Sequence, residues 1–234
     1  MTDRNKDVVP GTRASVLSRA LLERTRELNR DYVELLLAER SLPAPGIVAE
    51  SLPVKILGAL DDLSSEARSA LAACPYSLYA LAFDDLRFWS AALDGTAAQG
   101  HDRSIEARYG AISPAPMQAA FCETAVFLAW HTAQSQRLAA RFLFGMPDTI
   151  AHLLARAPLW QIRRVALDYP GLLAPRWPRN PAFWPDLVRF AEADDSRLEA
   201  ARLLGSQLIA SELDGTLPRS TRRRVALRPQ PVRG

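Results

Sequence analysis

Apolar side chains recur at helical spacing along most of this chain. The first clear instance lies between residues 15 and 40, which contain no proline or glycine and are rich in Leu, Arg and Glu. One face of a helix over this segment carries Leu21, Leu28, Tyr32 and Leu35. No segment of the chain sustains the period-two alternation of a strand. The pattern therefore predicts an all-α protein that opens with a long amphipathic helix.

Turn-forming residues divide the rest of the chain into further predicted helices. Pro53 opens a short helix, since proline is favoured in a first turn. Ser64 is placed to cap the next helix, and Pro75 closes it. The stretch DGTAAQGHDRS, residues 94–104, predicts a loop, which residues 110–116 extend. The remaining predicted helices are one or two within 76–93, a second long one at 117–144, and shorter ones at 147–156, 159–169, 181–192 and 196–213.

The two halves of the chain repeat one order of landmarks. Leu52-Pro53 and Met146-Pro147 each open a short helix after a long one. A Phe-Trp pair then lies thirteen and fourteen residues beyond a second proline, as Phe88-Trp89 after Pro75 and as Phe183-Trp184 after Pro170. This order predicts an internal duplication. Because each unit presents an apolar face that it cannot cover alone, we expect two similar helical units packed as a pseudo-dimer, with the Trp side chains as core anchors.

Charge is distributed unevenly between the predicted segments. The chain has a net charge of +3, and residues 217–234 hold six arginines and no acid, so the rest carries −3. A segment of this kind is either a solvated, disordered end or a binding arm for a polyanion or an acidic partner. The predicted ranges are a disordered N-terminus at 1–14, a first unit at 15–93, a linker at 94–116, a second unit at 117–213 and a basic, disordered tail at 214–234.

Hydropathy also indicates where the protein resides. No uninterrupted apolar run approaches the roughly 20 residues of a membrane-spanning helix. The first residues, MTDRNKDVVPGTR, lack the basic start and apolar stretch of a secretion signal. We therefore expect a cytoplasmic protein without membrane insertion.

The residue types that carry catalysis are not grouped in any recognised motif. The chain has no phosphate-binding glycine loop, no GxSxG or HExxH motif and no paired CxxC. Its two cysteines lie in apolar helical surroundings, as small buried hydrophobes do, and its three histidines are scattered. We expect no enzyme activity, cofactor, metal or small-molecule substrate. The residues considered are Cys74, Cys122, His101, His131 and His152.

Residues 141–177 carry the most informative pattern. Phe142 is followed three residues later by Gly145, and the pattern continues through Asp148, Ala151, Leu154-Ala155, Leu159, Gln161 and Ala166. This stretch resembles the flagellar transcriptional regulator FlhD, an all-helical family that works with its partner FlhC. Residues 28–40, LNRDYVELLLAER, look like that family's opening helix. The chain departs from the family in its double length, its C-terminal helix and basic tail, and the Pro158 and Trp160 that flank Leu159.

The resemblance implies a tandem, single-chain version of a unit that the family uses as a homodimer. It also implies a transcriptional regulator that binds DNA alone or with a protein partner. Independently, the short helices at 147–156 and 159–169 have the dimensions of a helix-turn-helix. Gln161, Arg163 and Arg164 are residue types that reach base edges and phosphates, unless they form a solvated face. Arg222, Arg223 and Arg224 of the tail are further candidates for binding duplex DNA.

A second class of function fits the same features. A non-catalytic helical adaptor or accessory subunit, for example of a type III secretion sorting platform, would have this composition and would expose apolar helix faces to partners. Both classes predict a protein partner or a homo-oligomer. They differ over duplex DNA, which a regulator should bind in a salt-sensitive way and an adaptor should not.

Overall fold

Ser18 determines where the first long helix begins. The computed structural model describes residues 17–42, 47–94, 105, 108–109, 115–192 and 195–215. Helix α1 spans Arg19–Arg40, and the Ser18 hydroxyl accepts a hydrogen bond from the Leu21 amide at 3.2 Å. Three residues of the predicted stripe, Leu28, Tyr32 and Leu35, are buried on its inner face. The long amphipathic helix expected from the sequence is thus present.

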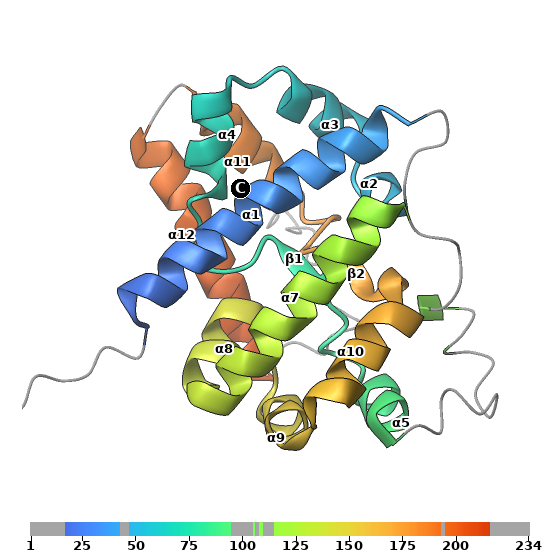
Figure 1. The fold of residues 1–234 in the computed structure, drawn as a ribbon. Helices are drawn as coiled ribbons and strands as arrows, with labels where there is room; N and C mark the ends of the chain where they lie inside the picture. Colours follow the sequence, from blue (N-terminus) through green and yellow to red (C-terminus); the bar gives the residue numbers. More distant parts are fainter. Residues whose placement is uncertain are drawn as a thin grey trace, which may run out of the picture.

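Two units with the same order of elements follow one another along the chain (Figure 1). Helices α3 and α9 begin 94 residues apart, and so do α4 and α10. The protein is mainly helical and consists of two similar units, as predicted. In the first unit α1 is followed by α2 (Ile47–Glu50), α3 (Val54–Asp61), α4 (Ser65–Ala72), β1 (Tyr79–Leu81) and α5 (Leu86–Asp94). In the second unit α7 (Pro116–Ser135) is followed by α8 (Arg137–Phe144), α9 (Asp148–Arg156), α10 (Leu159–Asp168), the 3₁₀ helix η2 (Pro170–Leu172), β2 (Leu173–Pro175) and α11 (Phe183–Phe190), and α12 (Asp195–Leu213) comes last.

Two predicted helices are interrupted in the structure. The segment 117–144 forms two helices, because Gln136 has an extended backbone (φ −147°, ψ 73°) that turns α8 back against α7. The bend allows α8 to bury Ala139, Ala140 and Leu143. The segment 76–93 contains strand β1 before α5. A three-residue strand is too short to show an alternating pattern, and its partner strand lies in the other half of the chain.

Strands β1 and β2 join the two units. They form an antiparallel ribbon in which Ala80 lies opposite Ala174. The Arg176 amide continues the pairing by donating to the Leu78 carbonyl at 2.9 Å. Antiparallel neighbours are related by a two-fold rotation. The ribbon therefore lies on the pseudo-two-fold axis that relates the units.

The buried side chain of Asn29 on α1 holds the turn that leads into β1. Its amide nitrogen donates to the carbonyls of Ala72 at 3.2 Å and Tyr76 at 2.8 Å, and its oxygen accepts from the Leu78 amide at 2.8 Å. These backbone groups are removed from water and have no regular helix or strand to pair with. One amide side chain therefore fixes the position of the strand relative to α1.

Each unit places the helix that carries its Phe-Trp pair against the other unit. Helix α5 packs against α9 and α10, whereas α11 packs against α3 (Figure 1). These two helices carry the predicted pairs Phe88-Trp89 and Phe183-Trp184, and no member of either pair is more than 1% exposed. The two units consequently share one hydrophobic core, in the manner of a dimer with exchanged helices.

The two tryptophans have equivalent surroundings. Trp89 Nε1 donates to the Leu81 carbonyl at 3.2 Å, and Trp184 Nε1 donates to the Arg176 carbonyl at 2.6 Å. The acceptor lies eight residues earlier in both cases. A residue with positive φ follows each acceptor, Ala82 at 49° and Trp177 at 47°. Because residues with a Cβ atom rarely adopt this conformation, its presence at both places marks a turn that belongs to the repeated unit.

Two helices flank the predicted linker. Helix α5 ends at Asp94 and α7 begins at Pro116. The predicted N-terminal segment 1–14 lies outside the described residues, as do most of the linker 94–116 and most of the tail 214–234. In the part of the chain that is described, no helix combines the length and the apolar character needed to cross a lipid bilayer.

The exchange of α5 and α11 predicts that neither unit folds alone. We expect separate fragments of residues 15–94 and 95–215 to be largely unfolded, because each lacks the surface that covers its Phe-Trp helix. Mixed together, they should recover the helical circular dichroism and buried-tryptophan fluorescence of the intact chain. A first fragment that ends at Leu81 and so lacks α5 should fail to complement. Independent folding of either fragment as a monomer would contradict the shared core.

Candidate functional site

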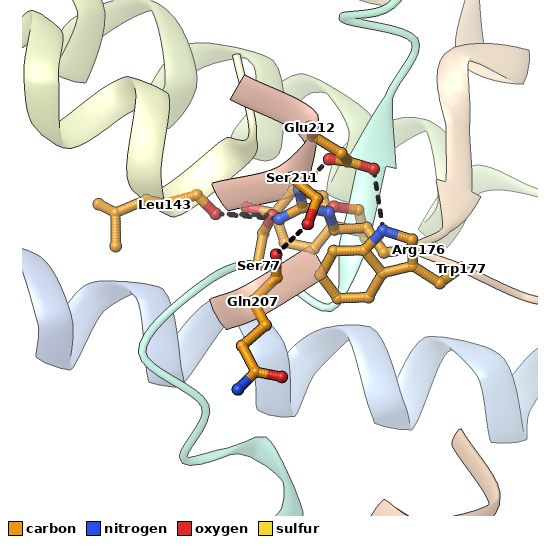
Figure 2. A network of polar contacts seen from close by, with 8 residues as sticks. Ser77, Leu143, Arg176, Trp177, Gln207, Ser211 and Glu212 are labelled. Carbon is orange, nitrogen blue, oxygen red and sulfur yellow. Dashed lines mark hydrogen bonds and ion pairs between the residues drawn. The ribbon is translucent and has the colours of Figure 1, made fainter. Parts of the chain in front are cut away.

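A group of buried polar contacts surrounds Arg176, directly after β2 (Figure 2). Arg176 is 4% exposed, and its Nη2 lies 3.0 Å from Glu212 Oε2 on α12. The other carboxylate oxygen of Glu212 accepts a hydrogen bond from Trp177 Nε1 at 2.9 Å. Arg176 Nη1 also donates to the Leu143 carbonyl at 3.4 Å. One carboxylate of α12 thus binds the two residues that follow the strand.

Gly145 makes room for this ion pair. It ends α8 in the left-handed conformation with φ 62°, which favours glycine. A Cβ atom at this position would lie 2.1 Å from Arg176 Nη2 and 2.9 Å from Glu212 Oε2. The nearby Leu143 carbonyl also accepts from the Ser77 amide at 2.9 Å. The cluster therefore connects α8, one end of the ribbon and α12.

The interactions of this cluster hold parts of the protein together. Burial lowers the pKa of Arg176, and the carboxylate of Glu212 opposes that shift by favouring the charged guanidinium. Trp177 covers the guanidinium, whose Cζ lies 4.4 Å from the ring centroid. A buried charge can indicate an active site, but these donors point at protein groups. We interpret the cluster as the fixed point of the C-terminal half of α12.

A second anchor holds the middle of α12. The Tyr76 hydroxyl donates to the Arg202 carbonyl at 2.8 Å, and Arg202 Nη2 donates to the Ala70 carbonyl at 2.5 Å. Gly205 lets the helix approach closely, because a Cβ atom there would lie 2.0 Å from the Tyr76 hydroxyl. Helix α12 is therefore held against the rest of the protein at its middle as well as in its C-terminal half.

The cysteines and histidines do not assemble into a reactive group within the described residues. Burial raises the pKa of Cys74 and of Cys122 to about 12, so both thiols stay protonated near neutral pH. His152 lies on the surface near Asp148. No three His, Cys, Asp or Glu side chains in the described part of the chain are placed to hold a metal ion. His131 is exposed, and His101 lies outside the described residues.

An open hollow of about 420 Å³ lies between the first turns of α1 and the last turns of α7. Its walls include the apolar side chains of Leu21 and Leu128, with Arg24 and His131 beside them. The lining contains no carboxylate or thiol that could act together with the histidine. The hollow alone indicates no reaction.

Two of the predicted DNA-contacting arginines, Arg163 and Arg164, lie on α10, and each contacts another group of the protein. Arg163 Nε lies 3.4 Å from Glu123 Oε1 on α7. Arg164 Nη2 donates to the Ala92 carbonyl of α5 at 2.6 Å. Each side chain would have to leave its partner to reach a phosphate. Gln161 is half-buried, and Arg222, Arg223 and Arg224 lie outside the described residues.

The outward surface of α10 is largely apolar. Leu159 is 51% exposed, Trp160 is 61% exposed and Leu167 is 54% exposed. Together with Arg163 and Arg164 these three residues form what we name the α10 face. The inner side of the helix buries Ile162, Val165 and Ala166 instead. Sequence reasoning missed the face, although its apolar residues fall outside that inner stripe and could have signalled it.

The other unit shows that the fold does not require this face. Helix α4 is the counterpart of α10, and the offset of 94 residues places Ser65, Glu66 and Ala73 at the positions of the three apolar residues. Ser65 and Glu66 are exposed polar residues. Since the same architecture tolerates polar side chains there, the apolar residues of α10 are a specialisation of one unit.

Comparison with models of protein families, with curated proteins and with solved structures gives no match for this chain.

Removing the carboxylate that anchors α12 should destabilise the protein strongly. We expect Glu212→Ala to lower the free energy of unfolding by about 3 to 5 kcal/mol, because Arg176 is left buried without its counter-ion. The control is Glu23→Ala, which removes an exposed ion pair with Arg19 and should cost at most about 1 kcal/mol. Urea denaturation measures both. Similar small losses would contradict the assignment of Glu212 as an anchor.

The α10 face should contribute little to folding. We expect Trp160→Ala to change the free energy of unfolding by less than about 1 kcal/mol, since most of the side chain is already in water. By contrast, Trp184→Ala should cost about 3 to 5 kcal/mol, because it leaves a cavity in the shared core. Thermal and urea unfolding of the two variants provide the comparison. A large loss for Trp160→Ala would mean that the residue is structural.

Proposed function

We propose that this protein is a FlhD-like transcriptional regulator, a single-chain pseudo-dimer that binds DNA alone or with a protein partner. The observation that carries the proposal is the arrangement of two like units about one ribbon, with their Phe-Trp helices exchanged. A tandem of this kind is what the resemblance implies for a family that works as a homodimer.

Four of the residues that carry the resemblance have clear structural roles, which supports a shared fold, whereas Phe142 and Leu159 are about half exposed. Gly145 provides the left-handed end of α8, and Ala151, Leu154 and Ala166 are at most 1% exposed. These positions demand a small, apolar or flexible residue for reasons of packing. The resemblance is therefore an argument about architecture, and DNA association needs a separate argument from charge.

The tail is the better candidate for phosphate contacts. Its six arginines carry no compensating acid over residues 217–234, whereas Arg163 and Arg164 already have partners. Closely spaced guanidinium groups release counterions when they bind a duplex, which gives affinity without sequence specificity. Base recognition would then depend on the partner protein.

The alternative is a non-catalytic adaptor, such as an accessory subunit of a type III secretion sorting platform. The α10 face favours it, because exposed leucine and tryptophan side chains suit protein contacts better than phosphate contacts. Under either function the chain acts through another protein or a further copy of itself.

Salt dependence of DNA binding tests the regulator proposal. We expect the intact chain to bind a duplex of about 30 base pairs with an affinity that falls steeply between 50 and 200 mM salt, on the order of 0.9 in log–log slope per phosphate contact. Replacing Arg222, Arg223 and Arg224 by Gln should reduce that slope by roughly 3. Fluorescence anisotropy with labelled duplex measures it.

Two controls make the result specific. Replacing Arg163 and Arg164 by Gln should reduce the slope by less than about 1. Replacing three exposed arginines of α1, Arg19, Arg24 and Arg30, removes the same charge as the tail variant and should have little effect. Absence of any shift at 50 mM salt would rule out autonomous DNA binding and favour the adaptor.

A further inference from the structure

We propose that the α10 face is the docking site for an amphipathic helix of a protein partner that carries acidic side chains beside its apolar stripe. The inference deepens the proposed function and rests on it in one respect, namely that the chain acts through a partner. It names the surface and the chemistry of that partner.

The geometry of the face suits a helix. Leu159, Arg163 and Leu167 follow one another at intervals of four residues, and Trp160 and Arg164 form a neighbouring row with the same interval. From Leu159 to Leu167 the helix rises about 12 Å, which is enough to accept two to three turns of a packed helix. Trp160 is the most exposed of its apolar residues, and tryptophan is the side chain most often found at the energetic centre of a protein interface.

The charged side chains around the apolar residues determine which charge a partner should carry. Arg163 is exposed beside Leu159 and Leu167, and the Arg164 guanidinium lies 5.4 Å from the Trp160 ring centroid. Arg156, in the last turn of the preceding helix α9, is also exposed. These three arginines outnumber the neighbouring Glu123 and Asp168 by one charge. The Arg163 side chain also stays 66% exposed although it pairs with Glu123, so it can contact a second carboxylate. A partner helix with Glu or Asp flanking its apolar stripe is therefore complementary to this face.

Two other occupants fit less well. A second copy of the chain, docked through the same face about a two-fold axis, would bring arginines against arginines. Nucleic acid would gain stacking from Trp160 alone, because Leu159 and Leu167 offer neither a ring nor a hydrogen bond. An acidic amphipathic helix is the occupant that uses both the apolar and the basic groups of the face.

Selection from a displayed library of amphipathic helices, with randomised polar positions, tests the proposal on the full-length chain. We expect enrichment of Asp and Glu at the positions that flank the apolar stripe. The enriched peptides should bind the Trp160→Ser variant at least tenfold more weakly than the intact chain, as measured by calorimetry. The Arg163→Gln/Arg164→Gln variant should lose the preference for acidic over lysine-substituted versions of the same peptide.

The matched control is Leu203→Ser on α12, which changes a residue of similar exposure, 55%, away from this face. It should leave peptide affinity unchanged, and all variants are compared only after circular dichroism shows an intact fold. Failure to enrich any helix, enrichment of basic helices, or equal binding to the Trp160→Ser variant overturns the proposal. Self-association that depends on Trp160, seen by sedimentation, also overturns it in favour of a second copy.

The two proposals fail separately. Loss of the DNA shift while acidic helices still bind α10 removes the regulator function and keeps the docking site. A salt-sensitive DNA shift with no helix binding at α10 keeps the regulator function and removes the docking site.

Discussion

The structure depends on an exchange of the two Phe-Trp helices across one antiparallel ribbon. Helix α5 of the first unit is covered by α9 and α10 of the second, and α11 of the second is covered by α3 of the first. Each Trp indole N–H donates a hydrogen bond to a carbonyl eight residues earlier, and the residue after that carbonyl has a positive φ. These aromatic pairs can be buried only when both units are present, so we expect the two units to fold together.

The two units share this architecture but differ at their surfaces. The turn after β2 carries Arg176 and Trp177, which hold α12 through Glu212. The corresponding residues of the first unit are Leu81, at the end of β1, and Ala82, and neither carries a charge. Likewise α10 exposes Leu159 and Trp160 where α4 has serine and glutamate. Duplicated units keep the residues that their common fold requires, so the differences are where a role for one unit alone should be sought.

The proposals assign different tasks to different surfaces. In the sequence, basic charge without compensating acid is concentrated in residues 217–234, and phosphate contacts by such a segment need no fixed geometry. Three exposed large apolar side chains lie together on α10, where a rigid helix presents them at known spacing. A chain that binds DNA weakly and a partner specifically would use this division, because affinity for the backbone and recognition of a protein require different chemistry.

Local interactions made much of the fold predictable from the sequence. The helix cap at Ser64, the closing proline Pro75 and the repeated Phe-Trp pairs could be read directly, since capping and helical periodicity involve residues only a few positions apart. The bend at Gln136, the ribbon, the exchange of α5 and α11 and the anchoring of α12 could not be read, because each depends on contacts between residues far apart in the chain. The α10 face belongs to the same group. An apolar residue has the same letter whether a neighbouring helix covers it or not, and only the tertiary structure decides which of them remain in water.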